Sequence, residues 1–243
     1  MHRFFLSPVD WNAPGPALDA SESHHALDVL RLNIGDRLVA FNGEGSEATA
    51  QISAIEGKVA RLKLLQRSQT QPLPCAITLA QAVPKGKNMD FIIQKSVELG
   101  AARIAPLISD RTIVQLDAIE AAKKRDKWQE TALEACKQCG QNRIPNVATP
   151  RSVKAFLEAG DKFDLMLIAS LQPDSRKIKA VLAEVPGVRS VCVLVGPEGD
   201  FTPAELGLAK SHGCQPITLG PIILRTETAA LYCLSVLAHE LFG

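Results

Sequence analysis

Alternating apolar and polar residues mark the first part of the chain as β-structure. Residues 48–54 alternate strictly, and residues 59–64 repeat the alternation after the turn-forming residues 56–58. A period of two is typical of half-buried antiparallel strands. A further strand is predicted at Arg37–Phe41, and one short helix from about residue 23 to 32. Several short strands with a single helix favour a small closed β-barrel.

After residue 74 the pattern changes to apolar runs that alternate with amphipathic segments. Such runs predict strands covered on both faces, in a mainly parallel sheet. Capping boxes at Asp117–Glu120 and Thr202–Glu205 begin two of the helices. Gly100 ends the helix Met89–Leu99, and the last helix is predicted from about residue 228 to 241. The predicted strands are Cys75–Val83, Arg103–Ile108, Asp164–Ala169, Ser190–Val195 and Pro216–Leu219.

The polar, proline-containing segment Gln66–Pro74 separates the two patterns and is the best linker candidate. We therefore predict two domains, residues 1–70 and 71–243. No apolar run approaches the roughly 20 residues that a membrane span requires. Pro8 interrupts the N-terminal apolar run before it reaches the length of a signal-peptide core. The sequence thus predicts a soluble, cytoplasmic protein.

The chain has a net charge of +1, which excludes a uniformly basic nucleic-acid-binding protein. The charge is uneven, because residues 71–160 carry 13 Lys or Arg against 9 Asp or Glu, a net charge of +4. A solvated helix face explains the basic run Lys123–Lys127. Lys85, Lys87 and Arg111 lie near predicted strand ends instead, where an anionic partner could bind, although charge alone does not identify one.

The six cysteines do not form the dense pattern of a disulfide scaffold. Cys136 and Cys139 form a CxxC pair, a pattern found in redox and zinc sites. Here they share one apolar helical stripe with Ala132 and Ala135, and no second Cys or His pair at metal spacing accompanies them. We predict buried, reduced thiols and no metal site.

Two Gly-Pro loops follow predicted strands, where ligands bind in open parallel sheets. The glycines of Gly196–Asp200 let backbone amides approach a ligand, but the loop matches neither the dinucleotide-binding nor the P-loop pattern. The residues alone leave a plain structural corner and a small-molecule loop equally open. In the second loop, Leu219–Leu231, the helix dipole favours Glu227 but opposes Arg225. Arg225 therefore needs an acidic partner or an anionic ligand, and the ligand is favoured.

These loops carry a resemblance to a known family. GPEGDFTPAEL at 196–206 and LGPIILRTETAAL at 219–231 resemble the two C-terminal motifs of the ribosomal RNA small subunit methyltransferase E family, in the SPOUT superfamily. The resemblance covers essentially the whole chain. Further matching segments are 24–36, 81–100, 109–112 and 134–140.

The resemblance implies a PUA-like β-barrel that helps to hold RNA, followed by an α/β domain whose parallel sheet has a deep C-terminal trefoil knot, a rare topology. It implies a homodimer that uses S-adenosylmethionine (SAM) to methylate N3 of a uridine in 16S (small-subunit) ribosomal RNA. The cofactor loops would be Leu194–Gly199, Leu219–Ala229 and a third near Ser170–Leu171. The cofactor candidates are Leu171, Leu194, Val195, Gly196, Pro197, Glu198, Gly199, Leu219, Gly220, Ile222, Leu224, Arg225, Thr228 and Ala229.

The reaction requires alignment of the methyl donor with N3 and removal of the N3 proton. Arg225 is predicted to stabilise the developing uridine anion or to place a phosphate. Glu227 is predicted to orient Arg225 or to accept the proton. The RNA-binding candidates are Arg3, His24, Arg31, Lys85, Lys87 and Arg111.

Two positions depart from the family pattern. Asp200 stands where a second glycine is usual, and because Asp tolerates a positive φ we expect the turn to survive. Ile222 stands where an arginine is usual, so this chain lacks any contact that the arginine makes. Two other functions are considered: a transfer RNA ribose 2′-O-methyltransferase of the same superfamily, which the barrel and the GPEGD motif disfavour, and a non-catalytic RNA-binding ribosome-assembly factor. Intact Gly196 and Arg225 argue against the latter.

Overall fold

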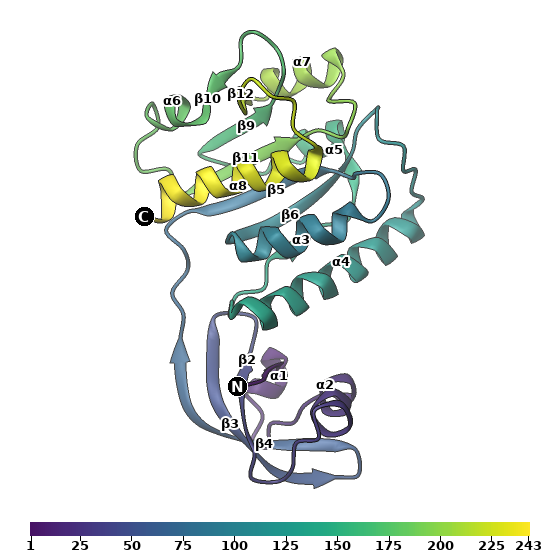
Figure 1. Ribbon diagram of the computed structural model, residues 1–243, viewed down its shortest axis with the longest axis vertical. Helices are drawn as coiled ribbons and strands as arrows, with labels where there is room; N and C mark the ends of the chain where they lie inside the picture. The colour runs from purple at the N-terminus through teal and green to yellow at the C-terminus, as the bar shows by residue number, and fades with distance from the viewer. The chain divides into compact units, whose positions relative to one another are not determined.

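The computed structural model describes residues 1–243, which form two compact units (Figure 1). The first unit contains residues 1–72 and 133–144, and the second contains residues 73–132 and 145–243. The division falls inside helix α4 (Ala118–Cys139), so the last turns of this helix belong to the first unit. The hydrophobic pattern of the sequence did not indicate this.

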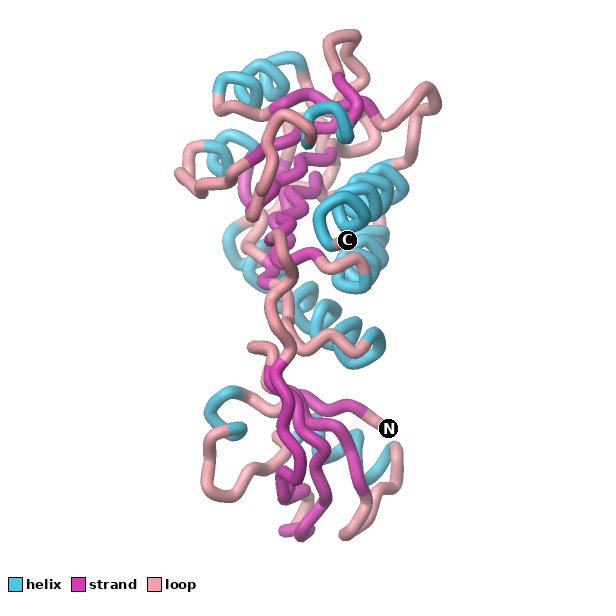
Figure 2. The backbone as a smooth tube through the Cα atoms, turned by 90° about the vertical axis from the view of Figure 1, so that its left-hand side faces the viewer, coloured by secondary structure: helices cyan, strands magenta, loops and turns pink.

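The first unit is built on a four-stranded sheet in the order β1-β2-β3-β4 (Figure 2). β1 is parallel to β2, and the other neighbours are antiparallel. β1 and β4 are the two ends of the sheet, so the strands do not form the closed hydrogen-bonded barrel that we predicted. The three-residue β1 is too short to complete the ring. The strands are β1 (Arg3–Phe5), β2 (Arg37–Phe41), β3 (Ser46–Glu56) and β4 (Val59–Gln69).

The alternation that predicted β3 is confirmed, since Ala48, Ala50 and Ile52 are buried in the core of this unit. β4 extends to Gln69, so the predicted linker Gln66–Pro74 is a strand in its first part. β4 is an edge strand, and its residues after Leu64 are exposed. Its exposed end is therefore polar, and a polar composition is also typical of a linker.

The helical segments of the first unit are α1 (Pro8–Trp11), α2 (Ala20–His24) and the π-helical turn η1 (His25–Val29). The predicted helix 23–32 therefore begins and ends earlier than expected. Asp19 caps α2, because its side chain accepts a hydrogen bond from the backbone N–H of Glu22 at 2.8 Å. The positive φ of Arg31, 56°, is incompatible with continuation of the helix.

The second unit contains an eight-stranded parallel sheet in the order β10-β12-β9-β11-β5-β6-β7, with β8 beside β6. The five predicted strands are all present; Ser190–Val195 has the predicted bounds, and the ends of the others are shifted by at most two residues. The three others have only two residues each and are too short to leave a pattern. The strands are β5 (Ala76–Ala82), β6 (Ala101–Ile108), β7 (Asn146–Val147), β8 (Arg151–Ser152), β9 (Leu165–Ala169), β10 (Arg176–Lys177), β11 (Ser190–Val195) and β12 (Gln215–Thr218).

Helices cover both faces of this sheet, as the continuous apolar runs predicted. Along β11, Val191 and Val193 pack in one hydrophobic cluster with α3 (Asn88–Glu98), α6 (Ile178–Leu182) and α8 (Thr226–Phe242). Cys192 and Leu194 pack in the opposite cluster, with α5 (Val153–Leu157) and α7 (Pro203–Ser211). α3 and α8 lie side by side in front of the sheet in Figure 1.

Both predicted capping boxes are present, at α4 and at α7. The cysteine prediction was correct in part. All six thiols are free, and burial raises the pKa of the Cys136 thiol to about 12. Cys139 is exposed, however, because it is the last residue of α4.

Candidate active site

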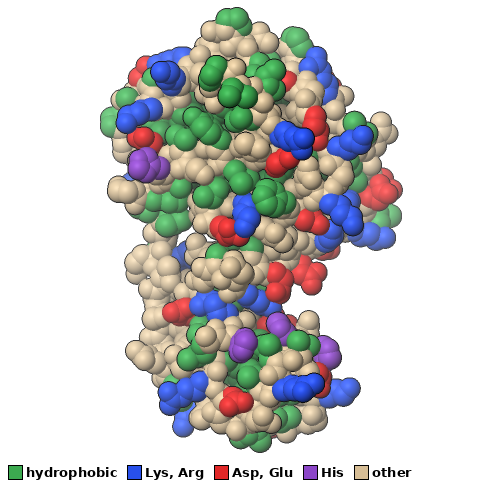
Figure 3. Space-filling model, viewed as in Figure 1, with side chains coloured by type: hydrophobic (Ala, Val, Ile, Leu, Met, Phe, Trp, Pro, Cys, Tyr) green, Lys and Arg blue, Asp and Glu red, His purple; other side chains and the backbone are tan.

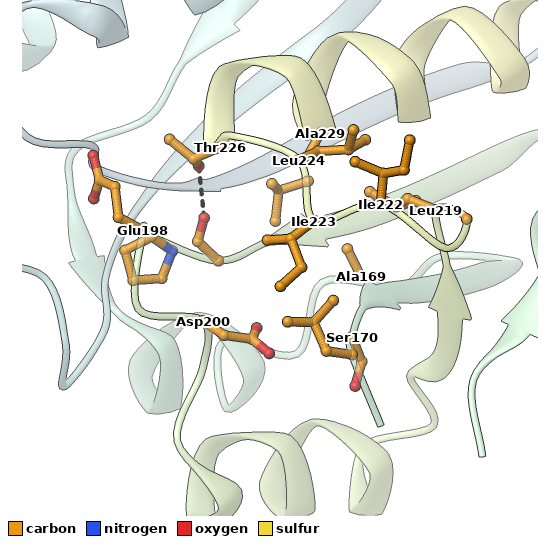
Figure 4. Close-up of a pocket in the computed structure, with 15 residues that line it drawn as sticks. Ala169, Ser170, Glu198, Asp200, Leu219, Ile222, Ile223, Leu224, Thr226 and Ala229 are labelled. Atoms are coloured by element: carbon orange, nitrogen blue, oxygen red, sulfur yellow. Dashed lines mark hydrogen bonds between the residues drawn. The ribbon is translucent and has the colours of Figure 1, made fainter. Parts of the chain in front are cut away.

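Loops from three adjacent strands meet at the carboxyl-terminal edge of the parallel sheet. β12, β9 and β11 are neighbours, and the segments that follow them are 219–225, 170–175 and 196–202. Residues of all three segments line a cavity that is open to solvent (Figure 4). This is the position at which open parallel sheets bind ligands.

The chemistry of the lining restricts the kind of ligand. Most of the wall is aliphatic, and Ile222 and Ile223 remain 74% and 78% exposed at the cavity. Glu198 and Asp200 also line it, whereas no Lys or Arg does. A wall with two carboxylates and no cation disfavours a nucleotide phosphate. It suits a ligand that has an apolar ring and a positive charge.

A chain of buried hydrogen bonds joins the cavity wall to the sheet. Thr226, the first residue of α8, donates its hydroxyl to the carbonyl oxygen of Gly196 at 2.6 Å, the bond dashed in Figure 4. The same hydroxyl accepts a hydrogen bond from Nε2 of Gln81 at 2.9 Å. Gln81 is fully buried near the end of β5. These bonds fix the start of α8 to the loop that follows β11.

The loop itself is a tight turn. The backbone N–H of Asp200 donates to the carbonyl oxygen of Pro197 at 3.0 Å, and Asp200 has a φ of 60°. The prediction that Asp would support this turn in place of glycine is confirmed. We expected Gly196 to let a ligand approach the backbone. The structure gives a different reason for glycine, because an added Cβ would lie 3.2 Å from the backbone nitrogen of Phe201 in the same turn. Gly196 thus permits the turn to close on itself.

The outer side of this loop, away from the cavity, is in contact with cationic residues. The backbone N–H of Lys85 donates to a carboxylate oxygen of Glu198 at 3.0 Å. The Arg111 guanidinium donates to the carbonyl oxygen of Gly199. An added Cβ on Gly199 would lie 3.3 Å from Cδ of Arg111, so the Arg111 side chain passes close to this glycine. Lys85, Lys87 and Arg111 are all exposed.

Comparison with known proteins agrees with this geometry. The family model described as "RNA methyltransferase domain" matches residues 71–238, and "RNA methyltransferase PUA domain" matches residues 18–65. The ribosomal RNA small subunit methyltransferase E of Bacillus subtilis is 33% identical over 99% of this chain and 97% of its own length. This chain belongs to the ribosomal RNA small subunit methyltransferase E family.

Solved structures show the same relationship. The methyltransferase E of Neisseria gonorrhoeae, bound to S-adenosyl methionine, is 34% identical, with a TM-score of 0.85 over 99% of this chain and 98% of that one. A Legionella pneumophila protein in complex with the bound cofactor SAM is 35% identical, with a TM-score of 0.89 over 99% of this chain and 98% of that one. The PUA-like first unit and the parallel-sheet second unit are thus those of the methyltransferase E family.

Most residues that the family resemblance assigned to the cofactor do line the cavity. Leu194 does not, because it is fully buried in the sheet, and Gly199 faces Arg111 instead. The lining also includes Ala169, Asp200, Ile223 and Thr226, which we had not selected. The predicted residues that line it are Leu171, Val195, Gly196, Pro197, Glu198, Leu219, Gly220, Ile222, Leu224 and Ala229.

The catalytic candidates lie at the start of α8, beside the cavity but not in its wall. Arg225 is the N-cap residue of α8, and its side chain is exposed. No acidic side chain pairs with it, which leaves the anionic ligand as the partner that its position calls for. Glu227 is half-buried in the first turn, and Thr228 is exposed.

The RNA-binding candidates of the first unit differ in their surroundings. The Arg3 side chain is only 16% exposed, pairs with Glu47 at 3.0 Å and lies 5.0 Å from the centre of the Phe41 ring. We therefore assign Arg3 a structural role. His24 is exposed, with Nδ1 2.6 Å from Asp28, and Arg31 is exposed.

No group of three or more His, Cys, Asp or Glu side chains is arranged to hold a metal ion. No helix combines the length and the apolar character needed to cross a membrane. Figure 3 shows apolar side chains on the surface of the second unit, with Lys and Arg among them.

Proposed function

We propose that this protein methylates N3 of a specific uridine in 16S ribosomal RNA of the small subunit, with S-adenosylmethionine as the methyl donor. The observation that carries the proposal is the cavity at the ends of β9, β11 and β12, with its aliphatic wall, two carboxylates and absence of cations. The family relationship and the SAM complexes of two relatives support it.

The residues of the cavity fit this cofactor. Leu219, Ile222 and Ile223 would cover the adenine ring, since their side chains are apolar and lie in the wall. Asp200 is the acidic group in the wall available to the positive charges of the amino acid and sulfonium parts, because the Glu198 carboxylate is bonded on the outer side of the loop to the backbone N–H of Lys85. When bound, SAM supplies an activated methyl group on a sulfonium sulfur, so the protein itself needs no nucleophile.

The work left to the chain is to hold uridine N3 in line with the methyl group and to remove the N3 proton. Arg225, exposed and without an acidic partner, would stabilise the negative charge that develops on the uracil ring. Glu227 follows it by two residues and would orient Arg225 or accept the proton. Lys85, Lys87 and Arg111 would bind RNA phosphates beside the cofactor loop.

The proposal includes three properties of the family that concern the second unit and its assembly. One is the trefoil knot, which rests on the family relationship. Another is a homodimer that uses α8, where Leu231 and Tyr232 are incompletely buried. The third is a cytoplasmic location.

Methylation of three purified substrates tests this function: small-subunit particles that lack the modification, free 16S rRNA and transfer RNA. Digestion to nucleosides and mass spectrometry identify the product. We expect N3-methyluridine in the rRNA. A ribose-methylated nucleoside in transfer RNA would indicate the other activity of the superfamily, and RNA binding without SAM binding would indicate an assembly factor.

A further inference from the structure

The carboxylate of Glu205 connects two loops beside the cofactor cavity. Glu205 is 7% exposed and occupies the first turn of α7. One of its oxygens accepts a hydrogen bond from the backbone N–H of Thr202 at 2.8 Å and so closes the capping box. The other accepts a hydrogen bond from the backbone N–H of Asp110 at 2.9 Å. A capping box requires only the first of these bonds, so the second requires another explanation.

The bond to Asp110 holds a tight turn after β6. In this turn the backbone N–H of Thr112 donates to the carbonyl oxygen of Ser109 at 2.9 Å, and the Thr112 hydroxyl accepts from the backbone N–H of Ser109 at 3.1 Å. Asp110 and Arg111 are the two central residues. The N–H of Asp110 points out of the turn to Glu205, which fixes the direction in which the next residue leaves.

That next residue is Arg111, whose side chain crosses to the loop that follows β11. One N–H of the guanidinium is bonded to the carbonyl oxygen of Gly199. A guanidinium has five N–H donors, and no other hydrogen bond or ion pair of this side chain to the protein is formed, although it is exposed. Its remaining donors are therefore available to a ligand on the outer side of the cofactor loop, near Lys85 and Lys87.

We propose that Glu205 is a positioning residue for the RNA substrate, acting through the Asp110 N–H to place the Arg111 guanidinium beside the cofactor loop. The inference rests on the proposed function, because it takes RNA as the ligand of Arg111. A displacement of about 1 Å at such a contact can lower the rate by about a hundredfold. Arg111 binds the RNA backbone, and Glu205 does not touch it.

The test is the Glu205→Gln variant. Gln keeps the size of the side chain, but it directs an N–H₂ group at either the Asp110 N–H or the Thr202 N–H, so one of the two bonds is lost. We expect kcat/KM for small-subunit particles to fall about tenfold to a hundredfold, mainly through a higher KM. The Kd for SAM, measured by calorimetry, is expected to stay unchanged.

Two comparisons separate positioning from a loss of helix stability. Ala204→Gly weakens the first turn of α7 at an exposed position and leaves the bond between Glu205 and Asp110 in place, so it should lower the melting temperature without raising the KM for RNA. Thr202→Ala is not a suitable control, because the Thr202 hydroxyl also donates to the Asp110 carboxylate at 3.3 Å. In a double-mutant cycle with Arg111→Ala, Glu205→Gln should cause little further loss, because both changes remove the same contact.

The proposal is overturned if Glu205→Gln leaves the KM for RNA at the wild-type value, or if its effect adds in full to that of Arg111→Ala. It is equally overturned if Ala204→Gly raises KM as much as Glu205→Gln. Wild-type methylation in the same assay tests the proposed function separately. If the wild type were inactive, filter binding would still measure the rRNA affinity of the wild type, Glu205→Gln, Arg111→Ala and the double variant. These four affinities would show whether Glu205 acts through Arg111.

Discussion

Thr226→Val tests whether the buried hydrogen bonds at the start of α8 hold the cofactor loop in place. Valine has nearly the shape of threonine, so the change removes the hydroxyl and little else. Thr226 is 4% exposed, and the hydroxyl both donates to Gly196 and accepts from Gln81. Thr226→Ser is the matched control, because it keeps the hydroxyl and removes one methyl group.

The structure allows the size of the effect to be worked out. The lost bond to Gly196 is worth about 1 kcal/mol, and an unpaired, buried N–H on Gln81 costs about 1–3 kcal/mol. The control loses about 0.8 kcal/mol with its methyl group. We therefore expect Thr226→Val to be about 2 kcal/mol less stable than Thr226→Ser, which corresponds to a melting temperature about 4–8 °C lower.

Thermal unfolding by circular dichroism and SAM titration by calorimetry measure the two consequences. SAM affinity should fall about tenfold in Thr226→Val, as a loss of about 1.4 kcal/mol from the binding free energy would produce. Adding Gln81→Leu should restore part of the stability, because no buried donor is then left unpaired. Equal melting temperatures and equal SAM affinities in the Val and Ser variants would refute the reasoning.

Three further predictions concern other parts of the molecule. Arg225→Ala should lower the single-turnover rate about a hundredfold to a thousandfold at saturating SAM while leaving the Kd for SAM unchanged, because the charge on uracil develops only in the transition state; a changed Kd with an unchanged rate would make Arg225 a binding residue only. Lys137→Met should cost about 3 kcal/mol in urea unfolding, because it leaves Glu22 buried without its cation, and Glu22→Gln in the same chain should recover most of it. Burial raises the pKa of Glu22 above its ordinary value of 4.5, so the buried carboxylate takes up a proton in the folded variant as the pH falls toward 4.5. The stability lost in Lys137→Met should therefore become smaller at low pH, and a loss that does not change with pH would contradict the pairing. A thiol reagent should label the native protein at Cys139, with Cys136, Cys214 and Cys233 protected by burial that raises the pKa of each to about 12, and Cys139→Ser should abolish the fast labelling.

The fold was predictable to the extent that each strand buries enough residues to leave a pattern. β11, with an uninterrupted apolar run, was placed at its correct ends, and the alternation in β3 identified the buried face of the first unit. That the first sheet stays open could not be predicted, because it depends on whether its two end strands, β1 and β4, pair with each other. The assignment of residues 133–144 to the first unit depends on side-chain contacts such as Lys137 with Glu22, which are 115 positions apart in the sequence.

The site was predicted at the level of its loops, and less well at the level of single residues. The glycines and prolines of the two loops indicated turns at strand ends, and Asp200 kept the turn as expected. The bonds of Thr226 with Gln81 and Gly196 could not be read from spacing, because they join distant segments. Spacing predicted Glu205 in its capping box but not its bond to the Asp110 N–H, for the same reason. The surroundings of Arg3 could not be predicted either, because its ion pair with Glu47 joins positions 44 apart in the sequence.

The most direct test of the central claim is mass spectrometry of nucleosides from small-subunit particles treated with the protein and SAM. We predict N3-methyluridine with the wild type and none with Gly196→Val, whose branched side chain would press against the backbone of Phe201 and displace the turn that lines the cavity. Calorimetry should show SAM binding by the wild type alone, and the circular dichroism spectra of the two proteins should match. Undiminished SAM binding by Gly196→Val, or a wild-type product other than N3-methyluridine, would contradict the account.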